Sequence, residues 1–578
     1  MLDSFFGRGK LKHSSLKLSE RVQKSVVDIL RAQPKLALEE TVGVPPLCWM
    51  IEMGTSLENI KAAYQVCPNV LKFKYGPSQE LPLHMACRSA SDEIIQFLVQ
   101  EFPKATSIAN ASNLLPIHVA LKTRPQWMEL RTIQTLLRSY PESVAIRAEL
   151  FSLEWISPLE FAIYQHYPVP VIEFMMTVVP CDMTELWMRS FNDISSEEIQ
   201  LVSECFPQLK ELKFEILSSM TDEDALLTLL HTLAAPNERL ERLNLWLPIG
   251  LLLNNEESQR LLSNLFKNNH HLISVELTEM RTPEVLADDH ADIMILDCIR
   301  EGLSQAPHSS ALQSLALDGM ILRDSCQVAQ FFASGVAPRR LRLTNTYWGE
   351  GNPGGIDVIQ DWSSCQIECL DIENCAIFPP FVEELFHCVS NMPNLRELTL
   401  WLTVLDQAPG RQRGILERKQ ISVTHHILRI LAQCPRLQKL LIQDTDLLVD
   451  IEPVCEVLCQ NNTLLDYYIE TSLNTEEKQK RLLDTLRRHN TTLQSACGRL
   501  PLGIGDNNAT KILHWMLLNR FGRAKLRNLQ IRGLNTLIHL LSIASEDRTR
   551  FLLRSYGMGQ FNILYGLLHE CPDLWCVP

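Results

Sequence analysis

The sequence lacks most of the short patterns that mark catalytic or metal-binding proteins. It has 17 Cys but no CxxC pair, so the cysteine spacing that is typical of zinc fingers and thioredoxin-like sites is absent. It contains no GxxxxGK[ST], which excludes a P-loop nucleotide site, and no GxSxG, HExxH or HRD motif. Gly accounts for only 23 of 578 residues, which excludes a collagen-like chain. We therefore expect a protein that is not an enzyme and that binds no metal or other cofactor.

Long apolar runs and excess positive charge are also missing. No stretch approaches the 18 to 20 apolar residues that cross a bilayer, and the first 15 residues have no apolar core of a secretory signal. Lys and Arg number 54 against 68 Asp and Glu, a net charge of −14, which disfavours a nucleic-acid partner. We expect a cytosolic or nuclear protein with no membrane partner.

Internal repeats dominate the first third of the chain. Leu81–Ala86 (LPLHMA) recurs 34 residues later as Leu115–Ala120 (LPIHVA), and weaker copies begin at Pro46 and Pro158. Each copy is followed by a second apolar helix that ends at a proline, and then by an extended loop; these prolines are Pro68, Pro103, Pro141 and Pro180. The pattern resembles the ankyrin repeat, whose signature is T-P-L-H-x-A. The resemblance implies that His84 and His118 are buried histidines that bond neighbouring loop backbone.

A second period begins after residue 205. Segments of the form L-x-x-L-x-L recur, and their middle residues are 26 to 42 positions apart: Leu212, Leu243, Val275, Leu315, Leu341, Leu370, Leu398, Leu440 and Tyr467. Helical patterns such as 258–268 and 476–490 lie between them. The pattern resembles the long leucine-rich repeat of ribonuclease-inhibitor-like proteins. The repeat also has an apolar residue seven positions after the middle residue in four copies: Leu322, Ile377, Leu405 and Leu447. Only Cys375 matches the usual Asn/Cys position.

Together these patterns predict α and α/β repeat solenoids: an ankyrin helix-turn-helix stack, then a leucine-rich horseshoe with parallel concave strands. We expect an N-terminal segment over 1–39 with a capping helix at 18–31. About four divergent ankyrin repeats follow over 40–190, about nine leucine-rich repeats over 191–498, and a helical C-terminal cap over 499–578. The block 518–523 (LNRFGR) resembles one in leucine-rich proteins of unicellular algae.

One glycine motif offers an alternative. Residues 349–354 (GEGNPG) match GxGxxG after a predicted strand, and Asp371 lies 22 residues beyond Gly349, as in a dinucleotide site. However, Pro353 lacks an N–H, and the flanking strands follow the leucine-rich register. A convex loop is the leading interpretation. A nucleotide-binding sensor or enzyme that uses residues 349–355 is the alternative.

The remaining candidates form a recognition surface. In an L-x-L strand the leucines point to the core and the intervening residues point to the concave face. This predicts a first row Lys213, Asn244, Glu276, Ala316, Arg342, Asp371, Thr399, Leu441 and Tyr468. The second row is Glu215, Trp246, Thr278, Asp318, Thr344, Glu373, Trp401, Gln443 and Glu470. Trp246 and Trp401 are either binding hot spots or satellite core under neighbouring loops.

Charge is uneven along the chain. Residues 193–301 hold 21 acidic and 8 basic side chains, a net −13, whereas 401–440 hold 7 basic and 2 acidic, a net +5. This is either a solvated surface or a bipolar one that steers a basic or mixed-charge protein partner. A basic loop lies inside the longest repeat, with Arg411, Arg413, Arg418 and Lys419.

We therefore predict a non-catalytic protein-binding module that acts as an adaptor or scaffold. Its binding residues on the concave face would be Trp246, Glu276, Arg342, Asp371, Glu373, Trp401 and Tyr468. Nucleic-acid or phosphopeptide binding by the basic C-terminal region is a further alternative. The adjacent pairs His270/His271 and His425/His426 are interpreted as surface residues, because helical neighbours point about 100° apart.

Overall fold

A computed structural model describes most of the chain. The described residues are 20–34, 45–123, 130–151, 154–178, 183–190, 196–203, 206–216, 223–248, 255–279, 295–306, 311–322, 325–348, 361–405, 419–443, 446–469, 476–490, 492–494, 512, 515, 516 and 519. They divide into two compact units, 1–232 and 233–578. Together they form a mixed architecture of helices and parallel strands, which is compatible with α/β repeats.

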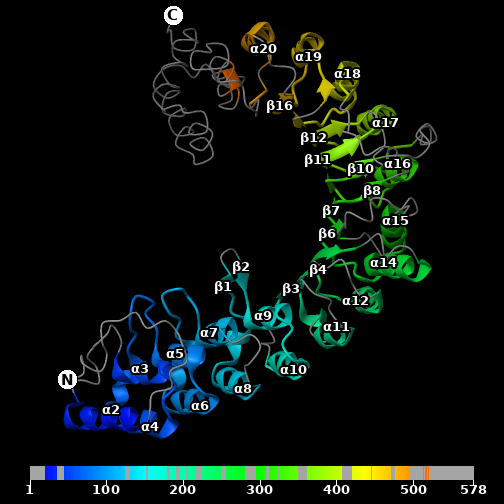
Figure 1. Ribbon diagram of the computed structural model, residues 1–578. Helices are drawn as coiled ribbons and strands as arrows, with labels where there is room; N and C mark the ends of the chain where they lie inside the picture. The colour runs from blue at the N-terminus through cyan, green and yellow to red at the C-terminus, as the bar shows by residue number, and fades with distance from the viewer. Residues whose placement is uncertain are drawn as a thin grey trace, which may run out of the picture. The chain divides into compact units, whose positions relative to one another are not determined.

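The first unit begins with helix α2 (Glu20–Ala32), close to the predicted capping helix, and continues as helix pairs (Figure 1). The pairs are α3 (Pro46–Glu52) with α4 (Leu57–Val66), α5 (Pro82–Ser89) with α6 (Asp92–Glu101), α7 (Pro116–Thr123) with α8 (Leu130–Ser139), and α9 (Pro158–Tyr164) with α10 (Val169–Thr177). First helices pack on first helices, and second helices on second helices. Each first helix has proline in its opening turn, where the missing N–H removes no helical bond.

The connections differ from the extended loops that were predicted. A short 3-10 turn starts at the proline after α4, α6 and α8: η2 (Pro68–Lys72), η3 (Pro103–Ser107) and η4 (Pro141–Ala145). Proline cannot continue the preceding helix, and its fixed φ suits the first position of a new turn. An antiparallel hairpin of β1 (Ala148–Phe151) and β2 (Glu154–Ile156), which the sequence did not predict, precedes α9.

Two histidines connect successive helix pairs, as predicted. His84 Nδ1 accepts a hydrogen bond from the Leu81 N–H (3.2 Å), and its Nε2–H donates to the Leu114 carbonyl (3.1 Å). His118 accepts from Leu115 N–H (3.0 Å) and donates to the Ile146 carbonyl (2.8 Å). Both side chains are fully buried, and burial lowers the pKa of each to about 4. They are therefore neutral structural groups.

In α9 a glutamate takes the place of this histidine. Glu160 is 1% exposed and accepts bonds from the Ser157 N–H (2.8 Å), the Trp187 N–H (2.7 Å) and Arg147 Nη2 (2.7 Å). Trp187 lies in β3 (Glu185–Ser190), which pairs in parallel with β4 (Glu211–Ile216). Glu160 therefore connects the last helix pair to the first parallel strand of this unit.

The strand β3 was missed by sequence analysis, which placed helix pairs up to residue 190. Its core residues are Met183, Leu186 and Met188, so methionine replaces leucine at two of the three pattern positions. The unit continues through α11 (Ser196–Ser203), η5 (Phe206–Gln208) and the start of α12 (Glu223–Ala234).

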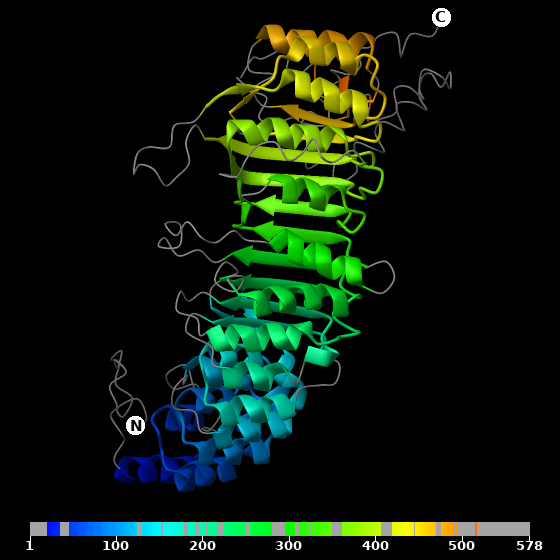
Figure 2. The ribbon, with the colours of Figure 1, turned by 90° about the vertical axis from the view of Figure 1, so that its right-hand side faces the viewer.

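The second unit is a parallel sheet with helices on one side (Figures 1 and 2). Its hydrogen-bonded order is β16, β14, β12, β11, β9, β7, β6, β5. These strands are β5 (Arg242–Leu247), β6 (Ser274–Glu279), β7 (Ser314–Asp318), β9 (Arg340–Thr344), β11 (Cys369–Ile377), β12 (Glu397–Val404), β14 (Lys439–Ile442) and β16 (Asp466–Ile469). Short strands pair beside them: β8 (Ile321–Leu322), β10 (Tyr347–Trp348), β13 (Ile421–Ser422) and β15 (Leu447–Leu448).

Helices connect most of these strands along one face. They are α14 (Glu256–Asn268), α15 (Ile295–Gln305), α16 (Ser325–Ala333), α17 (Pro379–Ser390), α18 (Thr424–Gln433), α19 (Ile451–Leu458) and α20 (Glu476–Arg488). The alternate leucines of the strands are buried against them, and so are the four apolar residues predicted seven positions on, Leu322, Ile377, Leu405 and Leu447. Cys375 also behaves as predicted, because its Sγ accepts from the Thr346 N–H (3.4 Å) and lies 3.4 Å from the Leu343 carbonyl.

Candidate binding surface on the parallel sheet

The surface of interest is the sheet face of the second unit that points away from the helices, which we call the open sheet face. Side chains along a strand alternate between the two sides of a sheet. In β5 and β9 the burial alternates accordingly, with Leu243, Leu245, Leu341 and Leu343 inside. The residues between these leucines therefore belong to the open sheet face.

The first predicted row lies in continuous register. Asn244 pairs with Glu276, Ala316, Arg342, Asp371, Thr399, Leu441 and Tyr468 in turn, one residue from each strand. Four of the predicted binding residues, Glu276, Arg342, Asp371 and Tyr468, thus share one row. Within it Asn244 Nδ2 donates to Glu276 Oε2 at 2.7 Å, so the Glu276 carboxylate is held within the protein.

The second row is continuous only up to Glu373. Trp246, Thr278, Asp318, Thr344 and Glu373 are in register, but β11 then shifts against β12 between Ile372 and Cys375. Ile372 pairs with Leu400 and Cys375 with Leu402, so Glu373 and Asn374 together face the single residue Trp401. The expectation that Glu373 and Trp401 are simple row neighbours is wrong. The extra residue is a bulge, and Asn374 adopts φ 54° there.

The bulge belongs to a polar ladder across β7, β9 and β11. Gly319 and Asn345 directly follow β7 and β9, Asn374 is the second residue of the bulge within β11, and all three have positive φ. Asn374 Nδ2 donates to Asn345 Oδ1 (2.5 Å), and Asn345 Nδ2 donates to Asp318 Oδ1 (2.7 Å). The ladder holds three successive repeats together at this edge of the sheet.

Trp246 and Trp401 are both half-buried. Their neighbours Thr278 and Thr399 on the same face are buried, with 7% and 6% exposure. Each indole therefore presents one part of its ring to solvent and packs the other part on the protein. This half-burial is compatible with a binding hot spot and with satellite core, and it does not distinguish the two.

The histidine pairs differ from each other. His270 and His271 have ring centroids 4.2 Å apart, and His271 is exposed. His426 is not a simple surface residue as predicted, because its ring stacks on Phe386 of α17 at 5.2 Å and on His425 at 3.7 Å. Burial, with nearby His425, Arg429 and His387, lowers the pKa of His426 to about 4. It packs α18 against α17.

Five of the buried cysteines have thiols that resist ionisation. Burial raises the pKa of the Cys298, Cys365 and Cys455 thiols to about 11, and that of Cys375 and Cys434 to about 12. Across the ranges given above, no group of three or more His, Cys, Asp or Glu residues has the geometry to hold a metal ion. These thiols behave as small apolar core groups.

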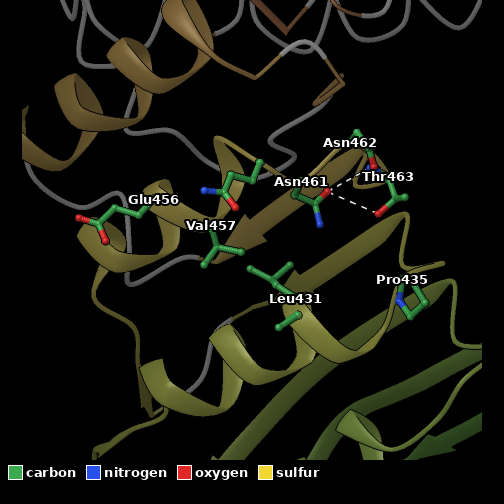
Figure 3. A pocket seen from close by; sticks show the side chains of 9 residues that line it. Leu431, Pro435, Glu456, Val457, Asn461, Asn462 and Thr463 are labelled. Carbon is green, nitrogen blue, oxygen red and sulfur yellow. Dashed lines mark hydrogen bonds between the residues drawn. The ribbon is translucent and has the colours of Figure 1, made fainter.

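An open pocket of about 510 Å³ lies between α18 and α19 (Figure 3). Its lining includes Leu431, Pro435, Glu456 and Val457. The most polar wall is occupied internally, because Asn461 Oδ1 accepts from the Thr463 N–H (3.1 Å) and hydroxyl (3.5 Å) and from the Leu464 N–H (2.9 Å). The pocket therefore offers a ligand a mixed opening, with apolar side chains, the exposed Glu456 carboxylate and the exposed amides of Gln460 and Asn462.

Several predicted residues lie outside the described residues. These include the 349–355 glycine loop, Arg411, Arg413 and Arg418 of the basic loop, Glu470, and nearly all of the 499–578 cap. Lys419 is described and is exposed. Lys213 belongs to the first unit, where its Nζ lies 2.7 Å from Glu215 Oε1 and 4.3 Å from the ring centre of Trp187.

Comparison with known proteins assigns no family: no protein-family model matches the sequence, and no curated protein matches it. Among the helices that the structure describes, none is both long and apolar enough to cross a membrane. The repeats and the open sheet face are therefore the features of this chain that bear on its function.

Proposed function

We propose that this protein is a non-catalytic protein-binding module, an adaptor or scaffold built from ankyrin-like helix pairs followed by leucine-rich repeats. The helix pairs with their bridging histidines, and the parallel strands with helices on one side, support this family interpretation. Repeat folds of these kinds present extended surfaces, although this part of the proposal is an analogy between folds.

One observation carries the proposal. The open sheet face presents one in-register row of side chains from eight consecutive paired strands and a second row from five of them, with both signs of charge and two half-buried tryptophans. Tryptophan and arginine supply much of the binding energy in protein interfaces. A surface of this length and mixed chemistry fits a protein partner better than a small molecule, which needs an enclosed site.

The cysteines bear on the compartment. Eight of the twelve cysteines within the described ranges are buried. We propose a reducing compartment, the cytosol or nucleus, because free thiols persist there.

The test is affinity capture with the full chain from its native lysate, followed by a direct binding measurement with each purified candidate. The unchanged chain should capture a discrete set of partners. A Trp246→Ala/Trp401→Ala variant should fail to capture this set. The control is Arg260→Ala/Glu383→Ala, which alters two exposed residues on α14 and α17. All three proteins are compared at matched thermal stability. If the tryptophan variant keeps every partner, the open sheet face is not the binding site.

A further inference from the structure

One strand of the open sheet face differs from its neighbours. In β9 both Arg340 and Arg342 are exposed, whereas the outward residues of β7 and those of β11 before the bulge are half-buried. The two arginines therefore stand above the strands on either side.

Within the part of the chain that the structure describes, neither guanidinium group has an ion-pair partner. Neither Arg340 nor Arg342 forms an ion pair or side-chain hydrogen bond with a described residue. Nearby arginines are used: Arg339 lies 3.5 Å and Arg396 lies 3.6 Å from Glu368 carboxylate oxygens. Two nearby guanidinium groups that form no ion pair with a described residue are a potential site for oxyanions.

The two sides of β9 are unequal. Toward β7 and β6 the register places Ser314 and then Ser274 in the row of Arg340, and Ala316 and then Glu276 in the row of Arg342. Glu276 lies two strands away from Arg342, and its carboxylate already accepts a hydrogen bond from Asn244. The small side chains of Ser314, Ser274 and Ala316 leave a shallow floor next to the guanidinium groups. Toward β11 the same rows hold Cys369 and Asp371, followed by Glu373, which disfavour an anion on that side. An anionic group therefore fits over β7 and not over β11.

The spacing of the arginines suggests the form of the ligand. Residues two apart on a strand are about 6.8 Å apart along it. An extended peptide with acidic side chains at alternate positions repeats its carboxylates at this same spacing. A nucleic-acid strand fits less well, because a continuous polyanion would also lie close to Asp318 at the end of β7 and to Asp371 on β11. A peptide needs acidic side chains only at the two positions over Arg340 and Arg342.

We propose that the strip formed by β7 and β9 binds an extended acidic segment of a partner protein, with Arg340 and Arg342 each contacting one of two alternate carboxylates. This inference rests on the proposed function, since it names the partner chemistry for part of the open sheet face. The floor of Ser274, Ser314 and Ala316 gives the segment room to lie close to the sheet.

The test uses the full chain and fluorescein-labelled peptides whose alternate residues are glutamate, glutamine or lysine. Anisotropy should show binding of the glutamate peptide, and at least about tenfold weaker binding of the glutamine peptide. The Arg340→Gln/Arg342→Gln substitutions should weaken binding of the glutamate peptide by a similar factor. Arg340→Glu/Arg342→Glu should abolish its binding and favour the lysine peptide.

Two matched variants make the result specific. Arg260→Gln/Lys480→Gln removes the same charge from exposed positions on α14 and α20 and should change the affinity by less than about twofold. Arg411→Gln/Arg413→Gln tests the basic loop instead. Unchanged binding by Arg340→Gln/Arg342→Gln, loss only in the loop variant, or tighter binding of labelled single-stranded DNA that depends on Arg340 and Arg342 would each overturn the inference.

This experiment separates the two proposals. If the glutamate peptide fails to bind while Trp246→Ala/Trp401→Ala still loses the captured partners, the acidic-segment inference fails and the protein-binding function stands. If no purified partner depends on the tryptophans but the peptide binds through Arg340 and Arg342, the arginine strip stands and the tryptophan site fails. If neither result is obtained, both proposals fail.

Discussion

The two kinds of repeat in this protein hold their neighbours in different ways. Between helix pairs of the first unit, polar connections depend largely on individual side chains. His84 and His118 are the most buried of these, Asn110 and Tyr167 add further bonds, and Glu160 makes the connection to β3. In the second unit every repeat is joined to the next by parallel strand pairing along several residues. Buried Asn269 and Asn490 add further bonds to the carbonyls of the preceding repeat.

Polar stabilisation between repeats is concentrated in a few side chains in the helix pairs, and it is shared along the backbone in the strand repeats. A helix pair offers its neighbour apolar packing but no backbone ladder, so a few polar side chains must satisfy most of the buried loop groups. A strand satisfies its own backbone along its length. We therefore expect single substitutions to have larger effects in the helix pairs than in the strand repeats.

The largest expected effect is at Glu160. Glu160→Ala removes the acceptor for two backbone N–H groups and for Arg147 in a buried site, so the free energy of unfolding should fall by about 3–5 kcal/mol. Hydrogen exchange should increase in α9 and β3 above all. Exposed Glu142→Ala is the control and should change stability by less than about 0.5 kcal/mol. Equal effects of the two substitutions would contradict the account.

Next in size is the pH dependence from His84 and His118. Their folded pKa values, about 4, lie below the ordinary 6.5, so each histidine favours the folded state fully above pH 6.5. That stabilisation is lost as the pH falls from 6.5 toward 4, by about 3 kcal/mol for each group.

This pH dependence can be measured by urea unfolding at several pH values, with hydrogen exchange reporting on α5 and α7. His84→Leu/His118→Leu should be less stable at pH 7, because four backbone partners lose their bonds, and should lose less stability between pH 6.5 and 4. A variant with the same pH slope as the unchanged protein would show that other groups cause it.

A smaller effect is expected at Asn490 in the strand repeats. Asn490→Ala removes bonds to the Leu458 carbonyl (2.8 Å) and from the Leu493 N–H (2.8 Å), and should cost about 2 kcal/mol. The strand pairing around it remains, so the loss should be confined to α20 and its neighbours in hydrogen exchange. Exposed Asn462→Ala serves as the control. A loss larger than that of Glu160→Ala would reverse the comparison.

The smallest expected effect is at Thr399 on the open sheet face. Its hydroxyl is buried and has no hydrogen-bond partner among the residues that the structure describes. Thr399→Val keeps the shape and removes the unsatisfied group, so thermal unfolding should be unchanged or stabilised by up to about 1 kcal/mol. Clear destabilisation would mean that the hydroxyl has a partner.

Sequence periodicity predicted the framework well. The six-residue repeats at Leu81 and Leu115 located α5 and α7, and the leucine pattern placed the first row in its observed order. This succeeded because a buried face imposes its period directly on the sequence.

Other features depend on contacts that a single sequence does not display. Strand β3 escaped because Met183 and Met188 fill leucine positions, and the bulge at Glu373 and Asn374 depends on one residue with positive φ. The exposure of Arg340 and Arg342 depends on the small neighbours Ser314 and Ala316, which are distant in sequence. The alternating pattern of β9 is ordinary and does not mark either arginine as exposed. Only Arg342 was predicted as a binding residue.

The most direct test of the central claim is site-specific photo-crosslinking with a purified partner. A photoreactive phenylalanine replaces Trp401 on the open sheet face, Glu383 on the helix side or exposed Trp155 in the β2 hairpin. We predict a single discrete adduct from position 401 and none from position 383, competed by unlabelled full-length protein. Adducts from position 383 or 155 without one from position 401 would contradict the claim that the open sheet face binds the partner.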